Sequence, residues 1–585
     1  MFRKTDPQRS LLECEFLVPP EKAERLKKSW AEVFRQRVLP LIDEEPFRDA
    51  FSEATGRPNK SIRLMLSLHI LKEVNDLTDE QVLEQLEFNL QWQYALGVTA
   101  DEAHTCQKSM HNFRVLLMGS ARAQKAFEQL TLALAEADKV KLAWQRLDST
   151  HVLSNIAVLT RLGLFVETVT NFLKELRRED PDAFESLSEG YVRRYLDREG
   201  YFSDAKRDQA KRRLSVVAED VYALVLMFET DAAVRELPSF QILLRLFEEQ
   251  CEVVSGEDDD DRDEHGGGQS GGDGPRVKLV DPKTVESDSL QSPHDPDATY
   301  GHKGKGYEVQ VSESCEDDNP YQVITGTSVG GAHESDQKAT VPMLDQLDDS
   351  GMKPEVMEAD TGYGSGENIV EAAVRGVDLH APVRDPDAPP PTEHFAAPVD
   401  VGDGEIEHAS EHAEEARSTA ERRTNESSVA PGASLGMESF AFDSTFHEVQ
   451  SCPDGWESER QQMAGGQLIA VFSSTHCSGC PLACCCPTRE LANGDRQLRR
   501  SPATIATERR QAEQQTTEFK ERYRKRSGIE STNQELKGRH GLRELRVRGK
   551  PRVELAVTLK SLALNIKRAM EYHVQKMAHC APCPC

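Results

Sequence analysis

The sequence predicts an α/β protein that is built on a mixed sheet. "GYEVQVSES" (306–314) and "YQVITGTSVGGA" (321–332) alternate apolar and polar residues, and the turn-rich "CEDDNP" joins them. This pattern predicts a β-hairpin. A helical segment (335–351), a third strand (354–360), a second helix (367–376) and a fourth strand (377–384) follow. Strands that alternate with helices in this way indicate a mixed α/β sheet.

Helical segments surround this sheet. Residues 57–118 carry apolar side chains at spacings of three and four, which predicts packed helices and, with them, a plain helical bundle or a domain for DNA binding or dimerisation. Residues 160–250 and the end of the chain are also helical in pattern. We therefore expect an amino-terminal helical domain (1–125), the first part of the core (126–159), a helical insertion (160–250), an acidic glycine-rich linker (251–275), the main core (276–395), an insertion with a cysteine cluster (396–510), basic helices (511–576) and a tail (577–585).

The charge of the chain is unevenly distributed. The 585 residues carry a net charge of -29 with a pI of about 5.1, which taken alone argues against a nucleic-acid partner. Much of the acid lies in 257–274 and 385–426, whereas 496–576 is rich in arginine and lysine. A local basic surface can therefore bind a phosphate backbone. No signal peptide or membrane-spanning run is visible, so we expect a cytoplasmic protein.

Three acids are candidates for chemistry. Asp148 follows a short apolar stretch that could be a central strand, although an Asp before Ser-Thr is more often a turn residue or helix cap. Asp360 ends a strand and meets a glycine-rich turn, where open α/β sheets place functional groups. Glu530 lies in "YRKRSGIESTNQELK" (523–537). Glu313 and Glu316 lie near the hairpin, but their spacing supports no role in an active site.

Two strand ends and a helix can bring three carboxylates to one edge of the sheet. Their charges would repel unless a cation is bound, and oxygen ligands suit Mg²⁺ or Mn²⁺. A pair of such ions can stabilise both the attacking and the leaving oxygen at a phosphodiester. The three acids therefore indicate phosphoryl transfer.

The segment around Glu530 has a helical arrangement of its own. At helical pitch Tyr523, Arg526, Glu530 and Lys537 lie along one side of a helix. A solvated helix with ordinary ion pairs would explain the same pattern.

Four motifs in this order resemble those of bacterial insertion-sequence transposases of the DDE type, which have a ribonuclease-H-like core. They are "RLDST" around Asp148, "SPHDPDATYGHKGKGYEVQV" (292–311), "EADTGYGSGEN" around Asp360, and the segment with spacing Y-x2-R-x3-E-x6-K around Glu530. Residues 57–118 resemble the amino-terminal domain of these proteins. The cysteine cluster resembles the subgroup called insertion sequence eleven eighty-two, which is related to the insertion sequence four and five superfamily.

The resemblance implies a catalytic triad of Asp148, Asp360 and Glu530 with two Mg²⁺ or Mn²⁺ ions. It implies binding of terminal inverted repeats in double-stranded DNA, hydrolysis of the 3′ strand at each element end, and transfer of the 3′ hydroxyl to target DNA. We expect a homodimer in the DNA complex, associated with the nucleoid. The residues expected to contact DNA are Tyr523, Arg526, Lys537, Arg539, Arg546 and Arg548. Two alternatives remain: a nuclease on the same core without strand transfer, and a DNA-binding protein that has lost catalysis.

Six of the 13 cysteines lie between residues 452 and 486, in a stretch that we expect to be irregular up to about residue 500. Cys452, the C-x2-C pair Cys477 and Cys480, and one of Cys484, Cys485 or Cys486 could form a tetrahedral thiolate site for structural Zn²⁺. The spacing in the resembling subgroup favours Cys486. The alternative is a set of buried thiols without metal, because the spacing from Cys452 is irregular and the other nearby candidate ligands are only His447 and His476. We expect Cys580, Cys583 and Cys585 to belong to a disordered end.

Overall fold

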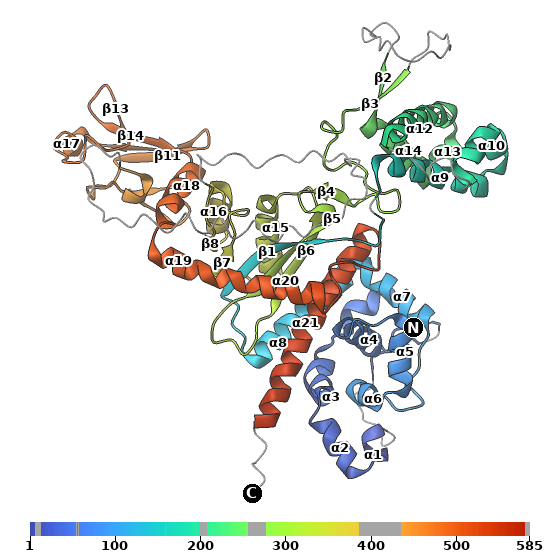
Figure 1. The fold of residues 1–585 in the computed structure, drawn as a ribbon. Coiled ribbons are helices and arrows are strands. Elements are labelled where there is room, and N and C mark those ends of the chain that lie inside the picture. The colour runs from blue at the N-terminus through green and yellow to red at the C-terminus, as the bar shows by residue number, and fades with distance from the viewer. Residues whose placement is uncertain are drawn as a thin grey trace.

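A six-stranded mixed sheet lies at the centre of the computed structural model, which describes residues 1–5, 13–53, 55–56, 58–157, 159–197, 207–254, 276–384 and 435–579 (Figure 1). Its strands are β1 (Trp144–Val152), β4 (Thr299–Gly301), β5 (Gly304–Ser314), β6 (Ile324–Gly331), β7 (Val356–Ala359) and β8 (Asp378–His380). β5 pairs antiparallel with β1 and β6, whereas β1, β7 and β8 pair in parallel. The predicted mixed sheet and the β5–β6 hairpin are confirmed.

Helices cover both faces of the sheet. α15 (Asp336–Asp349) and α16 (Gly366–Val374) share a buried core with Leu147 of β1 and Met357 of β7. The side chains of Val309 and Val311 on β5 belong to another core, which contains residues of the amino-terminal helices and of α21 (Lys550–His579). Apolar side chains of the sheet are therefore buried in two separate cores.

The amino-terminal helices pack beside α21. They are α1 (Cys14–Leu17), α2 (Pro20–Lys27), α3 (Trp30–Val33), α4 (Ile62–Val74), α5 (Asp79–Phe88), α6 (Leu90–Leu96), α7 (Gln107–Met118) and α8 (Arg122–Asp138), with the short turns η1 (Phe34–Val38), η2 (Leu39–Leu41), η3 (Glu45–Ala50) and η4 (Gly119–Ala121). Thr78 and Gln81 form a capping box that starts α5. The packed helices predicted for 57–118 are confirmed.

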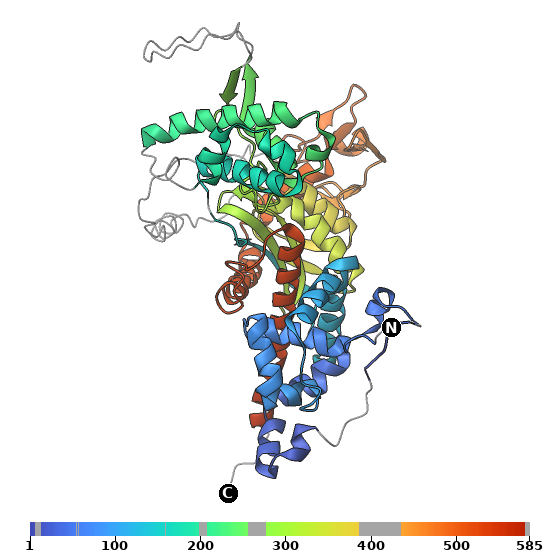
Figure 2. The ribbon, with the colours of Figure 1, turned by 90° about the vertical axis from the view of Figure 1, so that its right-hand side faces the viewer.

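A second helical group lies between β1 and β5 along the chain, where the sequence predicts a helical insertion. It consists of α9 (Arg161–Glu179), α10 (Pro181–Glu185), α11 (Glu189–Tyr191), η5 (Val192–Leu196), α12 (Arg207–Phe228), α13 (Ala232–Arg235) and α14 (Pro238–Gln250). Figure 2 shows this group and the amino-terminal helices at opposite ends of the molecule. The prediction of a linker from residue 251 was wrong at its start, because β2 (Cys251–Val254) pairs with β3 (Arg276–Leu279). The acidic run 257–274 lies outside the described residues.

The cysteine-bearing segment is more regular than its sequence predicts. It contains η7 (Met437–Ser439), β9 (Ala441–Phe442), β10 (Val449–Ser451), β11 (Arg460–Ala464), β12 (Gln467–Phe472), α17 (Ser474–Cys477), β13 (Arg489–Glu490) and β14 (Arg496–Arg500). The prediction of an irregular stretch was therefore wrong, since β11, β12, β14 and β13 form an antiparallel sheet. Phe440, Phe472 and Leu498 bury its core. The acidic stretch 385–426 and the tail cysteines lie outside the described residues.

The chain returns to the central sheet through consecutive helices, α18 (Pro502–Glu513), α19 (Thr517–Tyr523) and α20 (Gly528–Gly538), before α21. The predicted single helix over 523–537 was wrong: α19 ends at Tyr523, the 3₁₀ turn η8 (Arg524–Ser527) follows, and α20 begins at Gly528. Among the described helices none has the length and apolar character needed to span a bilayer.

Candidate active site

Asp148 and Asp360 lie side by side on neighbouring parallel strands. Leu147 of β1 pairs in register with Ala359, the last residue of β7, so the next residue of each strand is one of the two acids. Asp148 lies inside β1, which continues to Val152, and not at a strand end as the sequence predicts. The longer β1 is possible because its second half still pairs with β5. Asp360 therefore follows the end of β7 at the level of Asp148 in β1.

Arg526 connects the two aspartates to Glu530. Its Nη2 atom lies 2.8 Å from Oδ1 of Asp148 and 3.4 Å from Oδ2 of Asp360, and its Nη1 atom lies 3.3 Å from Oε1 of Glu530. Arg526 comes from η8 and Glu530 from the first turn of α20, so the turn and the helix both face the strand ends. One guanidinium therefore contacts all three acids that the sequence predicts.

Burial differs among these groups. The side chains of Asp148 and Arg526 are 12% and 17% exposed, whereas that of Glu530 is 64% exposed. Burial raises the pKa of Asp148, the charge of Asp360 raises it further, and Arg526 opposes the change. Burial acts against the charged form of Arg526, but Asp148 and Asp360 outweigh it and raise the arginine pKa. The carboxylates thus hold the guanidinium charged.

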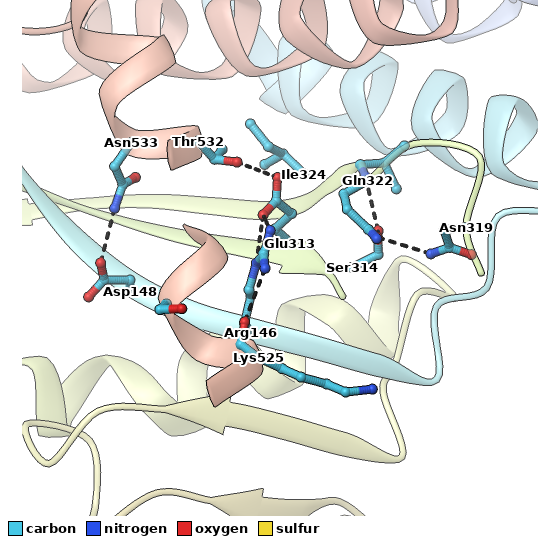
Figure 3. Close-up of polar contacts among 12 residues, drawn as sticks. Arg146, Asp148, Glu313, Ser314, Asn319, Gln322, Ile324, Lys525, Thr532 and Asn533 are labelled. Carbon is cyan, nitrogen blue, oxygen red and sulfur yellow. Dashed lines mark hydrogen bonds and ion pairs between the residues drawn. The ribbon is translucent and has the colours of Figure 1, made fainter. Parts of the chain in front are cut away.

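Asn533 is a site residue that the sequence analysis missed. It lies on α20, and its Nδ2 atom donates a hydrogen bond of 3.1 Å to Oδ2 of Asp148 (Figure 3). The Oδ1 atom of Asn533 is buried without a hydrogen-bond partner. The signal was available, because Asn533 follows Glu530 by three residues and so shares its side of the helix.

A further carboxylate, Asp336, lies near the pair and was also missed. Its Oδ2 atom accepts a hydrogen bond of 3.2 Å from Ser149, and its Oδ1 atom accepts one of 2.9 Å from Gln310. Burial raises the pKa of Asp336. The pKa of Tyr363 is well above its usual value through burial and through Asp336, Asp148 and Asp360. Nothing in the sequence motifs indicated Asp336, which the fold brings in at the start of α15.

The donor atoms at this site suit a hard cation. Carboxylate oxygens with an amide beside them are typical Mg²⁺ and Mn²⁺ ligands. In the described parts of the chain, however, no group of three or more His, Cys, Asp or Glu side chains is arranged so that it could hold a metal ion. Arg526 lies among the three acids and supplies the positive charge there. The residues fit divalent cations in chemistry, and a cation shared by all three acids requires that Arg526 move.

The other predicted DNA contacts differ in burial and in the groups that lie beside them. Tyr523 stacks on Phe519 with ring centroids 6.1 Å apart, and burial raises its pKa. Lys537 is half-buried, and burial together with the charge of Lys303 lowers its pKa. The remaining three residues are exposed and pair with other groups: Arg539 with Glu535, Arg546 with Asp76, and Arg548 with the carbonyl of Asn155.

Four of the predicted zinc ligands lie around one cavity, although in the described residues they do not have the arrangement of a metal site. Cys452, Cys477, Cys480 and Cys486 line one small cavity with Phe472 and Arg496. Burial and the three neighbouring thiols raise the pKa of Cys477. Cys484 is exposed, and Cys485 donates from its thiol to the carbonyl of Leu482. His476 stacks on Trp456 with ring centroids 3.8 Å apart.

Comparisons with known proteins match two parts of the chain. Residues 450–570 match a family model described as a transposase DDE domain, and residues 22–116 match one described as a transposase domain. The first match includes Glu530, whereas Asp148 and Asp360 lie in neither. An uncharacterized protein, ORF8 in the nfe locus of Rhizobium meliloti, is 47% identical over 60 residues, which are 10% of this chain and 29% of that protein. No solved structure matches.

The mixed sheet with adjacent acids and an amino-terminal helical region is compatible with the ribonuclease-H-like fold of DDE enzymes. Two separate segments of the chain, 22–116 and 450–570, are thus similar to domains of transposases.

Proposed function

We propose that this protein is a catalytically competent transposase that binds terminal inverted repeats, hydrolyses the 3′ strand at each element end and joins the 3′ hydroxyl to target DNA. The observation that carries the proposal is the convergence of Asp148, Asp360 and Glu530 on one guanidinium. These acids come from two adjacent strands and a helix that are far apart in the sequence. Three carboxylates that lie close together repel one another, and positive charge such as bound metal ions must offset this repulsion.

Asp148, Asp360 and Glu530 would hold two Mg²⁺ or Mn²⁺ ions, which when bound supply the positive charge that stabilises the attacking and leaving oxygens of a phosphodiester. Asn533 keeps one oxygen of Asp148 in a fixed orientation. Arg526 now contacts Asp148. Once cations replace it there, its guanidinium would contact a phosphate beside the scissile bond. Lys537, Arg539, Arg546 and Arg548 lie farther along the same segment, where we place the DNA backbone.

The decisive experiment separates cutting from joining. Wild-type protein with Mg²⁺ should nick DNA that carries the repeats, and it should join a pre-cut repeat end to a plasmid. Asp148→Asn, Asp360→Asn and Glu530→Gln should each abolish both reactions and leave repeat binding nearly intact. If any one of these variants cuts as the wild type does, that residue is not part of the triad.

Two other functions are outcomes of the same experiment. A protein that cuts repeat ends but never joins pre-cut ones is a nuclease. A protein that binds repeats and does neither is an inactive DNA-binding protein.

Further parts of the proposal concern the rest of the chain. We assign residues 1–125 to DNA binding or dimerisation, since a family model described as a transposase domain matches 22–116. A homodimer in the DNA complex, a place in the nucleoid and the insertion sequence eleven eighty-two subgroup belong to the same proposal. We also propose a structural Zn²⁺ at Cys452, Cys477, Cys480 and Cys486, which line one cavity, although these side chains do not have the arrangement of a metal site in the described structure.

A further inference from the structure

Glu313 is a fully buried acid outside the site described above. It lies near the end of β5, and none of its surface is exposed. A buried carboxylate is costly unless charged donors surround it. The burial of Glu313 therefore indicates a structural role, since a buried residue does not contribute to solubility or surface charge.

Three different elements donate to this carboxylate. Oε2 of Glu313 accepts a hydrogen bond of 2.8 Å from Nε of Arg146 on β1. Oε1 accepts one of 2.6 Å from Thr532 on α20 and one of 2.6 Å from Arg568 on α21. Figure 3 shows Arg146 and Thr532 reaching Glu313 from opposite sides. One carboxylate thus links the central strand to both carboxy-terminal helices.

These links lie on either side of Glu530. Before it, Nη1 of Arg146 donates a hydrogen bond of 3.1 Å to the carbonyl of Lys525 in η8. After it, Thr532 donates to Glu313. Glu530 itself is exposed, so core packing does not fix its side chain. The contacts of its neighbours determine where its backbone lies.

The approach of Arg146 to α20 is close. A Cβ atom built on Gly528 would lie 1.8 Å from Nη1 of Arg146, so the guanidinium occupies the space that a side chain would need. Arg146 is also two residues before Asp148 on the same strand. Arg146, which Glu313 holds in place, therefore packs the start of α20 against β1, the strand that carries Asp148.

We propose that Glu313 is a positioning residue for the third carboxylate of the site. Through Arg146 and Thr532 it holds η8 and α20 against β1, and this sets the distance of Glu530 from Asp148 and Asp360. It contacts neither DNA nor cation. The inference rests on the proposed function, because it assumes that the three acids share bound cations.

The test uses a matched pair of threonines. Thr532→Val removes the hydroxyl that donates to Glu313 and keeps the side-chain shape. Thr325→Val is the control: Thr325 is equally buried, and its hydroxyl donates to Gln145 and Ser312, neither of which belongs to α20. Glu313→Gln removes the charge itself, and thermal unfolding reports whether each variant folds.

Binding of Mn²⁺ without DNA, followed by electron paramagnetic resonance of the free ion, is the first readout. Thr532→Val and Glu313→Gln should weaken Mn²⁺ binding by about 10-fold or more, the usual effect of removing a group that orients a ligand. Thr325→Val should bind Mn²⁺ as the wild type does even if its melting temperature falls. Hydrogen exchange over 524–538 should rise in Thr532→Val and stay unchanged in Thr325→Val.

The two possible failures differ. If wild-type protein binds Mn²⁺ in a manner that Asp148→Asn abolishes, and Thr532→Val still matches Thr325→Val in Mn²⁺ affinity and in exchange, the role of Glu313 is overturned and the proposed function stands. If the wild type neither binds Mn²⁺ through Asp148 nor cuts repeat DNA, the proposed function is overturned, and this role with it.

Discussion

The contacts of Arg526 differ from those that its sequence motif predicts. The motif places it among lysines and arginines that contact DNA, yet its guanidinium contacts Asp148, Asp360 and Glu530. The guanidinium of Arg526 offsets part of the negative charge of the three carboxylates, which a divalent ion would otherwise offset. We therefore propose that Arg526 occupies the place of the cations in the absence of DNA, and that it would become free to contact a phosphate when cations bind.

This competition predicts opposite effects on two measurements. Arg526→Ala should raise the affinity for Mn²⁺ in the absence of DNA, on the order of tenfold, because one positive charge near the acids is lost. Cutting of repeat DNA should fall, because the phosphate contact is lost too. Isothermal titration with Mn²⁺ and a nicking assay measure the two effects.

Arg524→Ala is the control for this prediction, since Arg524 is exposed in the same turn and donates to none of the three acids in the described structure. Equal or weaker Mn²⁺ binding by Arg526→Ala than by Arg524→Ala would contradict the competition.

At the scale of elements, α20 depends on a glycine at its first residue. Gly528 leaves the space that Arg146 fills, whereas Gly538 at the other end of α20 has no atom within 4 Å of its Cβ position. Gly528→Ala should therefore destabilise the fold by about 1–3 kcal/mol, the range typical of overpacking. Cleavage should fall with it, since the same helix carries Glu530.

Gly538→Ala serves as the comparison for Gly528→Ala. It should be neutral or stabilise the protein by at most about 1 kcal/mol, because alanine restricts the unfolded chain more than glycine does. Urea unfolding measures both variants. A similar change in the two would show that Arg146 yields easily to a side chain at Gly528.

The cysteine-bearing sheet is the second element with a prediction of its own. Cys452, Cys477, Cys480 and Cys486 line one cavity, so we expect about one zinc per chain in protein purified without chelators. Cys477→Ser combined with Cys480→Ser should lose the zinc and lower the melting temperature, because metal binding contributes to folding. Cys484→Ser, at an exposed position, should change neither. Elemental analysis that finds no zinc in the wild type would exclude the site.

At the scale of the whole molecule, the net charge of -29 must be reconciled with binding to DNA. Most of the basic residues after Arg496 belong to α18–α21 and the connecting segments, of which α19 and α20 pass in front of the sheet in Figure 1. The positive potential of such a surface attracts a polyanion. Salt screens the repulsion from acids that lie more than roughly 10 Å away.

Salt dependence tests this reconciliation. Arg539→Ala should weaken repeat binding and reduce the slope of log K against log salt by about 0.9, the value of one phosphate contact. Arg193→Ala is a matched control, because both arginines have side chains 75% exposed and both pair with a glutamate four residues earlier. The control should leave the slope unchanged. Equal slopes for the wild type and Arg539→Ala would remove Arg539 from the DNA surface.

The sequence alone determined those features that depend on neighbouring residues. Alternation predicted β5 and β6, spacings of three and four predicted α4–α7, and motif order drew attention to Asp148, Asp360 and Glu530. The sequence misjudged the helix over 523–537, which breaks at η8, and the cysteine-bearing strands, whose alternation is short and interrupted by turns. Local patterns are weakest where elements are only a few residues long.

Only the tertiary structure decided how the acids are surrounded. Glu313 has no significance in the sequence, yet it pairs with Arg146, 167 residues away, and with Thr532, 219 residues away. Arg526 reaches Asp148 across 378 residues. Hydrogen bonds and ion pairs of this kind depend on where strands and helices are packed, and periodicity along the chain contains no information about them. For this reason the sequence predicted which carboxylates act, whereas the fold determined what holds them in place.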